Sequence, residues 1–82
     1  MSEAGHHLHA LFPDHASALR MLKLGNAHFR KLADEHHDLE VQIQRFEAGL
    51  SAVSDEELET LKKRRLFILD EISALIAGQE AV

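Results

Sequence analysis

An all-α fold, made of a short N-terminal helix followed by an antiparallel two-helix coiled-coil hairpin, follows from three features of the sequence. Two stretches repeat apolar residues at alternating steps of three and four, which keeps these residues on one face of a helix. One short loop separates the stretches, and helices joined in this way bury their apolar faces by folding back on each other. The period-two alternation of strands is not found over any useful window. The two seams are Phe29, Leu32, His36, Leu39, Ile43, Phe46 and Leu50, and then Leu58, Leu61, Arg65, Ile68, Ile72 and Leu75.

The chain begins with a polar, histidine-rich stretch, residues 1–11, which we expect to form a flexible arm. Pro13 and Asp14 then favour a helix start, because proline is tolerated in the first turn and an acidic side chain suits the positive end of the helix dipole. Phe12 precedes them, where it could act as a hydrophobic staple. The sequence therefore predicts a short amphipathic helix over residues 14–24. Its expected apolar contacts are Leu19, Met21 and Leu22.

Gly25 and Asn26 mark a break before the first long helix. Glycine suits a helix end, and asparagine is among the best N-cap residues. The alternative is a single long helix that tolerates Gly25 at a cost of about 1 kcal/mol relative to alanine. With the break, the first long helix is predicted over residues 27–48, and Gly49 ends it.

The second long helix has the clearest boundary in the sequence. Ser54 and Glu57 have the spacing of a capping box, in which each side chain bonds the backbone N–H of the other residue. The helix is predicted over residues 55–77, with Gly78 at its end. Together, residues 12–82 are predicted to form a single helical-hairpin domain.

Two polar residues, His36 and Arg65, interrupt the seams, one in each long helix. In the antiparallel register, His36 faces Ile68 and Arg65 faces Leu39. His36 could be a pH-sensitive position, because histidine titrates near neutrality. The interpretation that we favour is a partly buried histidine that hydrogen-bonds locally and specifies the register. The direction of any pH effect stays open, since burial lowers a histidine pKa and acidic neighbours raise it.

The composition limits the classes of function. The chain has 82 residues, no cysteine and a formal net charge of −5. Disulfides and thiolate zinc sites are excluded, and so small a domain favours self-association as a stabilising device. An acidic chain is a poor candidate for non-specific DNA binding. No apolar run of about 18 residues predicts a membrane span, and the polar start is unlike a secretory signal, so we expect a cytoplasmic protein.

Catalysis is not expected. The serines are scattered, and Ser54 already has a capping role. No glycine-rich phosphate loop is present, and a hairpin of this size has little volume for a pocket of about 300 Å³ or more. We therefore expect no enzymatic activity, no cofactor and no small-molecule substrate.

The histidines of the arm could form a metal site or could simply belong to a polar tail. His6, His7 and His9 could bind zinc, nickel or copper weakly, because neutral imidazole is a common ligand of these metals. A structural zinc site, however, needs about four ligands in fixed geometry. We therefore favour a polar tail and assign no metal ligand.

The basic run Lys62-Lys63-Arg64-Arg65 also has two interpretations. It could contact nucleic acid or an acidic partner. The interpretation that we favour is that it balances acidic residues of the facing helix, and such flanking charges set orientation more than stability. In the predicted register Glu40 lies across from Arg64, and the head of Arg65 reaches Asp38.

The second long helix carries a wider apolar arc than one partner helix covers. Helices that are apolar over much of their circumference are normally covered on more than one side. The short first helix could cover part of the arc, and a second subunit is the other candidate. We therefore predict a non-enzymatic helical interaction module that self-associates or binds another protein in a groove beside the hairpin. Nucleic-acid binding through Lys62 to Arg65 is the alternative. The predicted interaction residues are Leu66, Phe67, Leu69 and Ile76.

Three motifs lie in a fixed order along the chain. They are Phe12-Pro13, then Phe29-x-x-Leu32-x-x-Glu35-His36-x-x-Leu39-x-x-x-Ile43-x-x-x-Glu47, then Glu57-x-x-x-Leu61-Lys62-Lys63-x-x-Leu66-x-x-x-Asp70-Glu71-Ile72. Over residues 12–75 this arrangement resembles the YdcH family, small bacterial proteins grouped as a domain of unknown function. The resemblance implies a helical, coiled-coil-like fold with no established enzymatic activity, and it supplies no catalytic residues. The chain departs from the family at Leu69, where a lysine is typical, and in its histidine-rich start; the leucine widens the apolar face and favours self-association.

Overall fold

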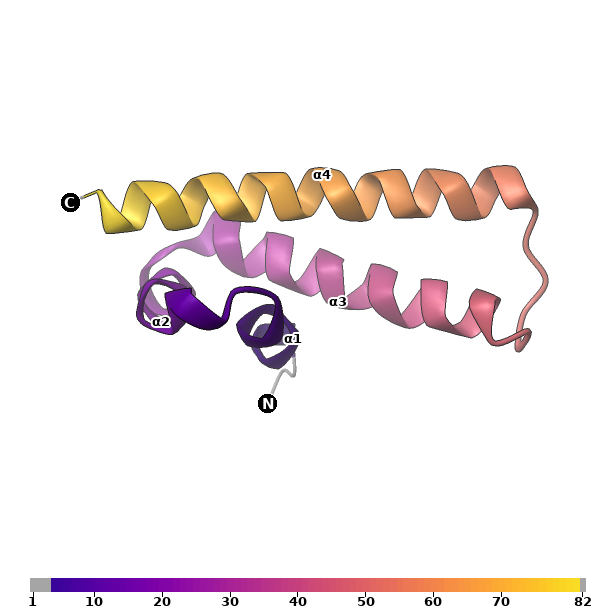
Figure 1. Cartoon of the computed structure of the whole chain (residues 1–82), viewed down its shortest axis with the longest axis horizontal. Coiled ribbons are helices and arrows are strands. Elements are labelled where there is room, and N and C mark those ends of the chain that lie inside the picture. The colour runs from indigo at the N-terminus through magenta and orange to yellow at the C-terminus, as the bar shows by residue number, and fades with distance from the viewer. Residues whose placement is uncertain (1–3, 82) are drawn as a thin grey trace.

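The computed structural model describes residues 4–81, which form an elongated helical molecule with extents of 44 × 24 × 22 Å. Two long helices lie antiparallel along the longest axis, and the N-terminal helices pack against them at the end away from the connecting loop (Figure 1). No strand occurs within residues 4–81. The predicted all-α hairpin is therefore confirmed. The elements are α1 (Ala4–Leu11), the 3-10 helix η1 (Pro13–His15), α2 (Ala16–Gly25), α3 (Ala27–Glu47) and α4 (Asp55–Glu80).

The N-terminal segment differs from the flexible arm that the sequence predicts for residues 1–11. Residues 4–11 form α1, and Leu8 is fully buried in the core. A helix of eight residues is not stable by itself in water, so α1 owes its order to packing against α2 and α3. The prediction of a flexible arm is wrong for residues 4–11, while residues 1–3 lie outside the described residues.

The helix predicted over residues 14–24 is present, but its start is shifted. Pro13–His15 form the single turn η1, closed by a hydrogen bond of 3.1 Å from the N–H of His15 to the carbonyl of Phe12. The α-helical geometry begins only at Ala16. Phe12 packs against the core, as a hydrophobic staple would. Of the three expected contacts of this helix, Leu19 and Leu22 are buried and Met21 is exposed.

Asn26 separates α2 from α3, as the sequence predicts. Its backbone is extended, and its Oδ1 accepts a hydrogen bond of 2.9 Å from the N–H of Phe29. Its own N–H donates to the carbonyl of Leu22 at 2.9 Å. One residue thus closes α2 and opens α3, so the alternative of a single long helix is wrong.

The turn after α3 is built on Gly49, whose φ of +76° suits glycine. The N–H of Leu50 donates to the carbonyl of Arg45 at 3.0 Å, and the N–H of Gly49 donates to the carbonyl of Phe46 at 3.1 Å. These two bonds form a Schellman motif. The turn carries Leu50 out of the seam, where its side chain is exposed. Ser54 then caps α4, because its hydroxyl accepts the N–H three residues later at 3.1 Å.

The core lies where α1 and α2 cover one side of the hairpin. The seam of α3 meets the seam of α4 there, and α2 packs against both long helices. Ile68 and Ile72 are fully buried in the middle of α4. The other buried members are Leu8, Ala18, Leu19, Leu22, Phe29, Leu32, Ala33, Leu39 and Ile76.

The helix α4 continues past Gly78, where the sequence predicts its end. It runs to Glu80, and the N–H of Ala81 donates to the carbonyl of Ala77 at 3.0 Å. A Cβ added at Gly78 would meet no atom within 4 Å. The predicted end is wrong because Gly78 adopts helical geometry like its neighbours.

Replacing Gly78 with alanine is therefore expected to raise the free energy of unfolding by about 0.5–1 kcal/mol, because alanine loses less backbone entropy in a helix. Urea denaturation followed by circular dichroism measures the change. The matched control is Gly49→Ala, which is expected to cost about 1 kcal/mol because φ is positive there. If Gly78→Ala destabilised the protein as Gly49→Ala does, α4 would end at Gly78 after all.

Candidate functional site

A groove of about 470 Å³ lies between α1, α3 and α4. It brings together residues that are far apart in the sequence. Its volume falls within the range of known binding sites, so the expectation that the hairpin has little room for a pocket of about 300 Å³ or more is wrong. We call it the α1–α4 groove. Its polar wall is His7, His36, Glu40, Lys62 and Arg65, and its apolar wall is Leu11, Leu66 and Leu69.

Glu40 is at the centre of the polar wall. One carboxylate oxygen accepts a hydrogen bond of 2.5 Å from Nη1 of Arg65, and the other lies 3.1 Å from Nε2 of His7. Burial raises the pKa of Glu40, but the hydrogen bond and charge of Arg65, with smaller effects of His7 and His36, leave that pKa below its usual value. Glu40 therefore links α3 to both α1 and α4.

His36 is the buried group of this wall, with only 1% of its surface exposed, whereas Glu40 is partly buried. Neither ring nitrogen has a hydrogen-bond partner among the described residues, and the ring centroid lies 5.5 Å from that of His7. Burial lowers the pKa of His36; Glu40 opposes this effect, whereas His7, Arg65 and His37 add to it. The seam position is as predicted, but the favoured interpretation of a locally hydrogen-bonded histidine is wrong.

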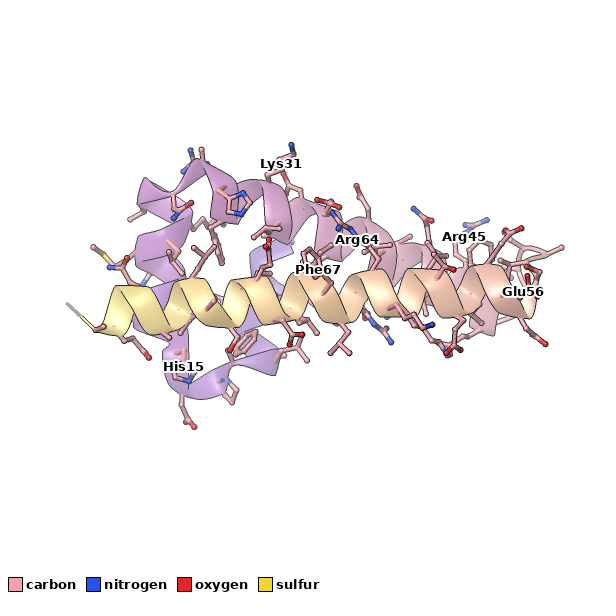
Figure 2. The ribbon with its side chains drawn as sticks, turned by 90° about the horizontal axis from the view of Figure 1, so that it is seen from above. His15, Lys31, Arg45, Glu56, Arg64 and Phe67 are labelled. Atoms are coloured by element: carbon pink, nitrogen blue, oxygen red, sulfur yellow. The ribbon has the colours of Figure 1, made fainter. Side chains whose placement is uncertain are left out.

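The four predicted interaction residues do not form one surface. Leu66 is 60% exposed in the α1–α4 groove, and Leu69 lies partly buried beside it. Phe67 is 50% exposed on another edge of α4, where the guanidinium of Arg64 lies 5.3 Å from its ring centroid. Figure 2 shows Phe67 and Arg64 on the edge of α4 opposite to His15. Ile76 is 3% exposed and belongs to the core, so a partner cannot reach it.

The basic run is largely neutralised within the hairpin. Its carboxylate partners all lie on α3, which supports the interpretation that the run balances the facing helix. The pairs are Lys62 with Glu47 at 2.9 Å, Arg64 with Glu35 at 2.8 Å, and Arg65 with Glu40. The predicted pairs Arg64–Glu40 and Arg65–Asp38 are wrong, because successive residues of a helix point about 100° apart. Arg65 turns into the α1–α4 groove, and Arg64 turns to the edge that carries Phe67.

Sequence reasoning missed the contribution of α1 to the groove, which consists of His7 and Leu11. One signal was available: Leu8 and Leu11 are three residues apart, which is the spacing of one helix face. Of the histidines considered as metal ligands, His7 is paired with Glu40 and His9 is partly buried, while the side chain of His6 lies outside what the structure describes. Within the described part of the chain, no three His, Cys, Asp or Glu side chains are arranged to hold a metal ion.

Three histidine–glutamate pairs connect different elements of the fold. His7 on α1 pairs with Glu40 on α3. The other two pairs both end on α4: His15 of η1 with Glu80 at 2.8 Å, and His28 of α3 with Glu71 at 3.6 Å. Among the described residues, these pairs tie α1 to α3, and η1 and α3 to α4. Over the described residues, no helix has the length and apolar character needed to cross a membrane.

A family model described as "Protein of unknown function (DUF465)" matches residues 29–76. The match covers nearly all of α3, the connecting turn and most of α4. No curated protein and no solved structure matches the chain. The α1 side of the groove, which consists of His7 and Leu11, therefore lies outside the matched stretch.

Proposed function

The chain belongs to the DUF465 family of proteins of unknown function, the same family as YdcH, and we propose that it is a non-enzymatic helical interaction module that self-associates through the α1–α4 groove. The family description assigns no activity, so the proposal rests on the surface of this chain. Cytoplasmic residence stays a prediction of the sequence.

The exposure of Leu66 inside the groove carries the proposal. Its side chain and that of Leu11 are open to solvent, with Leu69 partly buried between the helices. Grooves with apolar walls and polar rims are typical sites for an amphipathic helix. A second copy of the chain offers a matching exposed leucine, so a twofold contact can bury both grooves at once. For a chain of 82 residues, such a contact adds apolar burial that a small core lacks.

The polar wall favours a protein partner over nucleic acid. Lys62, Arg64 and Arg65 each pair with a glutamate of α3, so little positive charge remains to displace counterions from phosphates. Nucleic-acid binding through this run is therefore the weaker candidate. Salt-dependent binding of labelled RNA or DNA would favour it.

Replacing Leu66 with glutamine is expected to raise the dissociation constant for self-association by about tenfold or more, because losing a buried leucine contact costs at least 1.4 kcal/mol. Sedimentation equilibrium of the parent and the variant measures the change. Glutamine keeps the length and helix propensity of the side chain, so α4 is expected to stay intact.

The matched control is Phe67→Gln. Phe67 is the next residue, is also exposed, and lies outside the groove. It is expected to leave the dissociation constant within about threefold of the parent value, as a residue outside the interface does. Equal weakening by both substitutions would place the contact on a broader face of α4, and weakening by Phe67→Gln alone would move it to the opposite edge.

A further inference from the structure

We propose that protonation of His36 releases α1 from the hairpin and thereby removes one wall of the α1–α4 groove in acid. The consequence for self-association rests on the proposed function. The release itself does not, because it concerns contacts within one chain.

The geometry around His36 supplies the mechanism. The side chain belongs to α3, is buried, and has no hydrogen-bond partner on either ring nitrogen among the described residues. The ring of His7 on α1 lies 5.5 Å away, centroid to centroid. A neutral imidazole can stay in this position, but an imidazolium there has lost its water and gained no acceptor. Removing α1 is the smallest change that returns water to the ring.

The charged groups around His36 come from all three elements of the groove. His7 lies on α1, Glu40 and His37 on α3, and Arg65 on α4. Of these groups, Glu40 is the one that attracts a positive charge, and its two oxygens already contact Arg65 and His7. A proton on His36 therefore adds a positive charge beside that of Arg65 around one shared carboxylate. The lowered pKa of His36 agrees with this arrangement.

The structure indicates why α1 moves rather than the whole fold. This helix has eight residues, and its anchors are the buried Leu8 and the pair of His7 with Glu40. In contrast, α3 and α4 are long helices that pack against each other along the apolar seam. The pairs His15–Glu80 and His28–Glu71 also tie η1 and α3 to α4, and neither pair lies in the groove. Local opening of the least anchored segment is the expected response.

Release of α1 changes the groove itself. Leu11 leaves the apolar wall and His7 leaves the polar wall, while Leu66 and Leu69 stay on α4. The groove then loses one side of its apolar surface. Self-association through it is expected to weaken in acid.

Hydrogen exchange read by mass spectrometry tests the release on the full chain. The exchange of α1 is compared at about pH 7.5 and about pH 5, after correction for the intrinsic rate. Dilute protein, shown to be monomeric by sedimentation, separates the release from self-association. We expect the protection of α1 to fall about tenfold or more at the lower pH, while α3 and α4 keep theirs. The variant His36→Leu is expected to keep α1 protected at both values, and the control His28→Gln is expected to respond like the parent.

Three results would overturn the proposal: unchanged protection of α1 in acid, equal loss of protection in α1 and α4, or an acid response that persists in His36→Leu. A different result would contradict the proposed function alone: α1 is released in acid, but the parent is monomeric at every concentration. Conversely, association that resists acid together with unchanged α1 protection refutes the release alone.

Discussion

Replacing Ile72 with alanine is expected to lower the free energy of unfolding by about 3–4 kcal/mol, because it removes buried methylene groups and leaves a cavity. Ile72 is fully buried in the middle of α4, in the core shared by all four α-helices. Small domains are stable by only about 5–15 kcal/mol, so this single change removes a large fraction of the stability. Urea denaturation followed by circular dichroism measures it.

The control for this prediction is Leu24→Ala. Leu24 is a large aliphatic residue near the end of α2, but 78% of its surface is exposed. Its replacement is expected to change the free energy of unfolding by no more than about 0.5 kcal/mol. Equal effects of the two substitutions would mean that the seam of α4 does not form the core.

Replacing His36 with leucine is expected to raise the free energy of unfolding at neutral pH by about 1–3 kcal/mol, because it removes two buried polar atoms that lack hydrogen-bond partners. Leucine also matches the apolar seam and has a higher helix propensity than histidine. The native histidine at position 36 is thus expected to make the folded protein less stable than a leucine would. Such costs are typical of residues that serve a function, which agrees with a role of His36 in controlling α1.

The same variant is expected to lose part of the pH dependence of stability. The pKa of His36 is lower in the folded state than its ordinary value of 6.5, so the unfolded chain binds more protons between these two values. The parent is therefore fully stable above that ordinary value and loses stability as the pH falls below it. Glu40, whose pKa is also lowered, adds a second loss in stronger acid, below its ordinary value of 4.5.

The melting temperature measured between about pH 2 and about pH 8 separates the two groups. His36→Leu removes the loss near the histidine range and keeps the loss in stronger acid, because Glu40 still pairs with Arg65. Identical pH profiles of the parent and the variant would show that His36 does not titrate with folding.

Much of the hairpin could be predicted because its signals are local. The heptad spacing of the two seams, the cap at Ser54 and the turn at Gly49 each depend on residues close in the sequence. Local chemistry alone therefore placed the break at Asn26 and the ends of the connecting loop. The same logic identified His36 as a seam residue, which the structure shows buried.

The rest depends on tertiary contacts that no local pattern encodes. The helix α1 is too short to form alone, and only its packing against α2 and α3 orders it. Ile76 and Leu66 belong to the same predicted apolar arc of α4. In the structure Ile76 is buried in the core, whereas Leu66 is exposed. The partners of Arg64 and Arg65 depend on the rotation of α4 about its axis, which a register between seams does not specify.

Sedimentation equilibrium of the parent over a wide range of concentrations tests most directly whether the α1–α4 groove is a contact between copies of the chain. We expect a reversible dimer that Leu66→Gln weakens by about tenfold or more and that Phe67→Gln preserves. A monomer at every concentration, or a dimer that Leu66→Gln leaves unchanged, would contradict self-association through this groove.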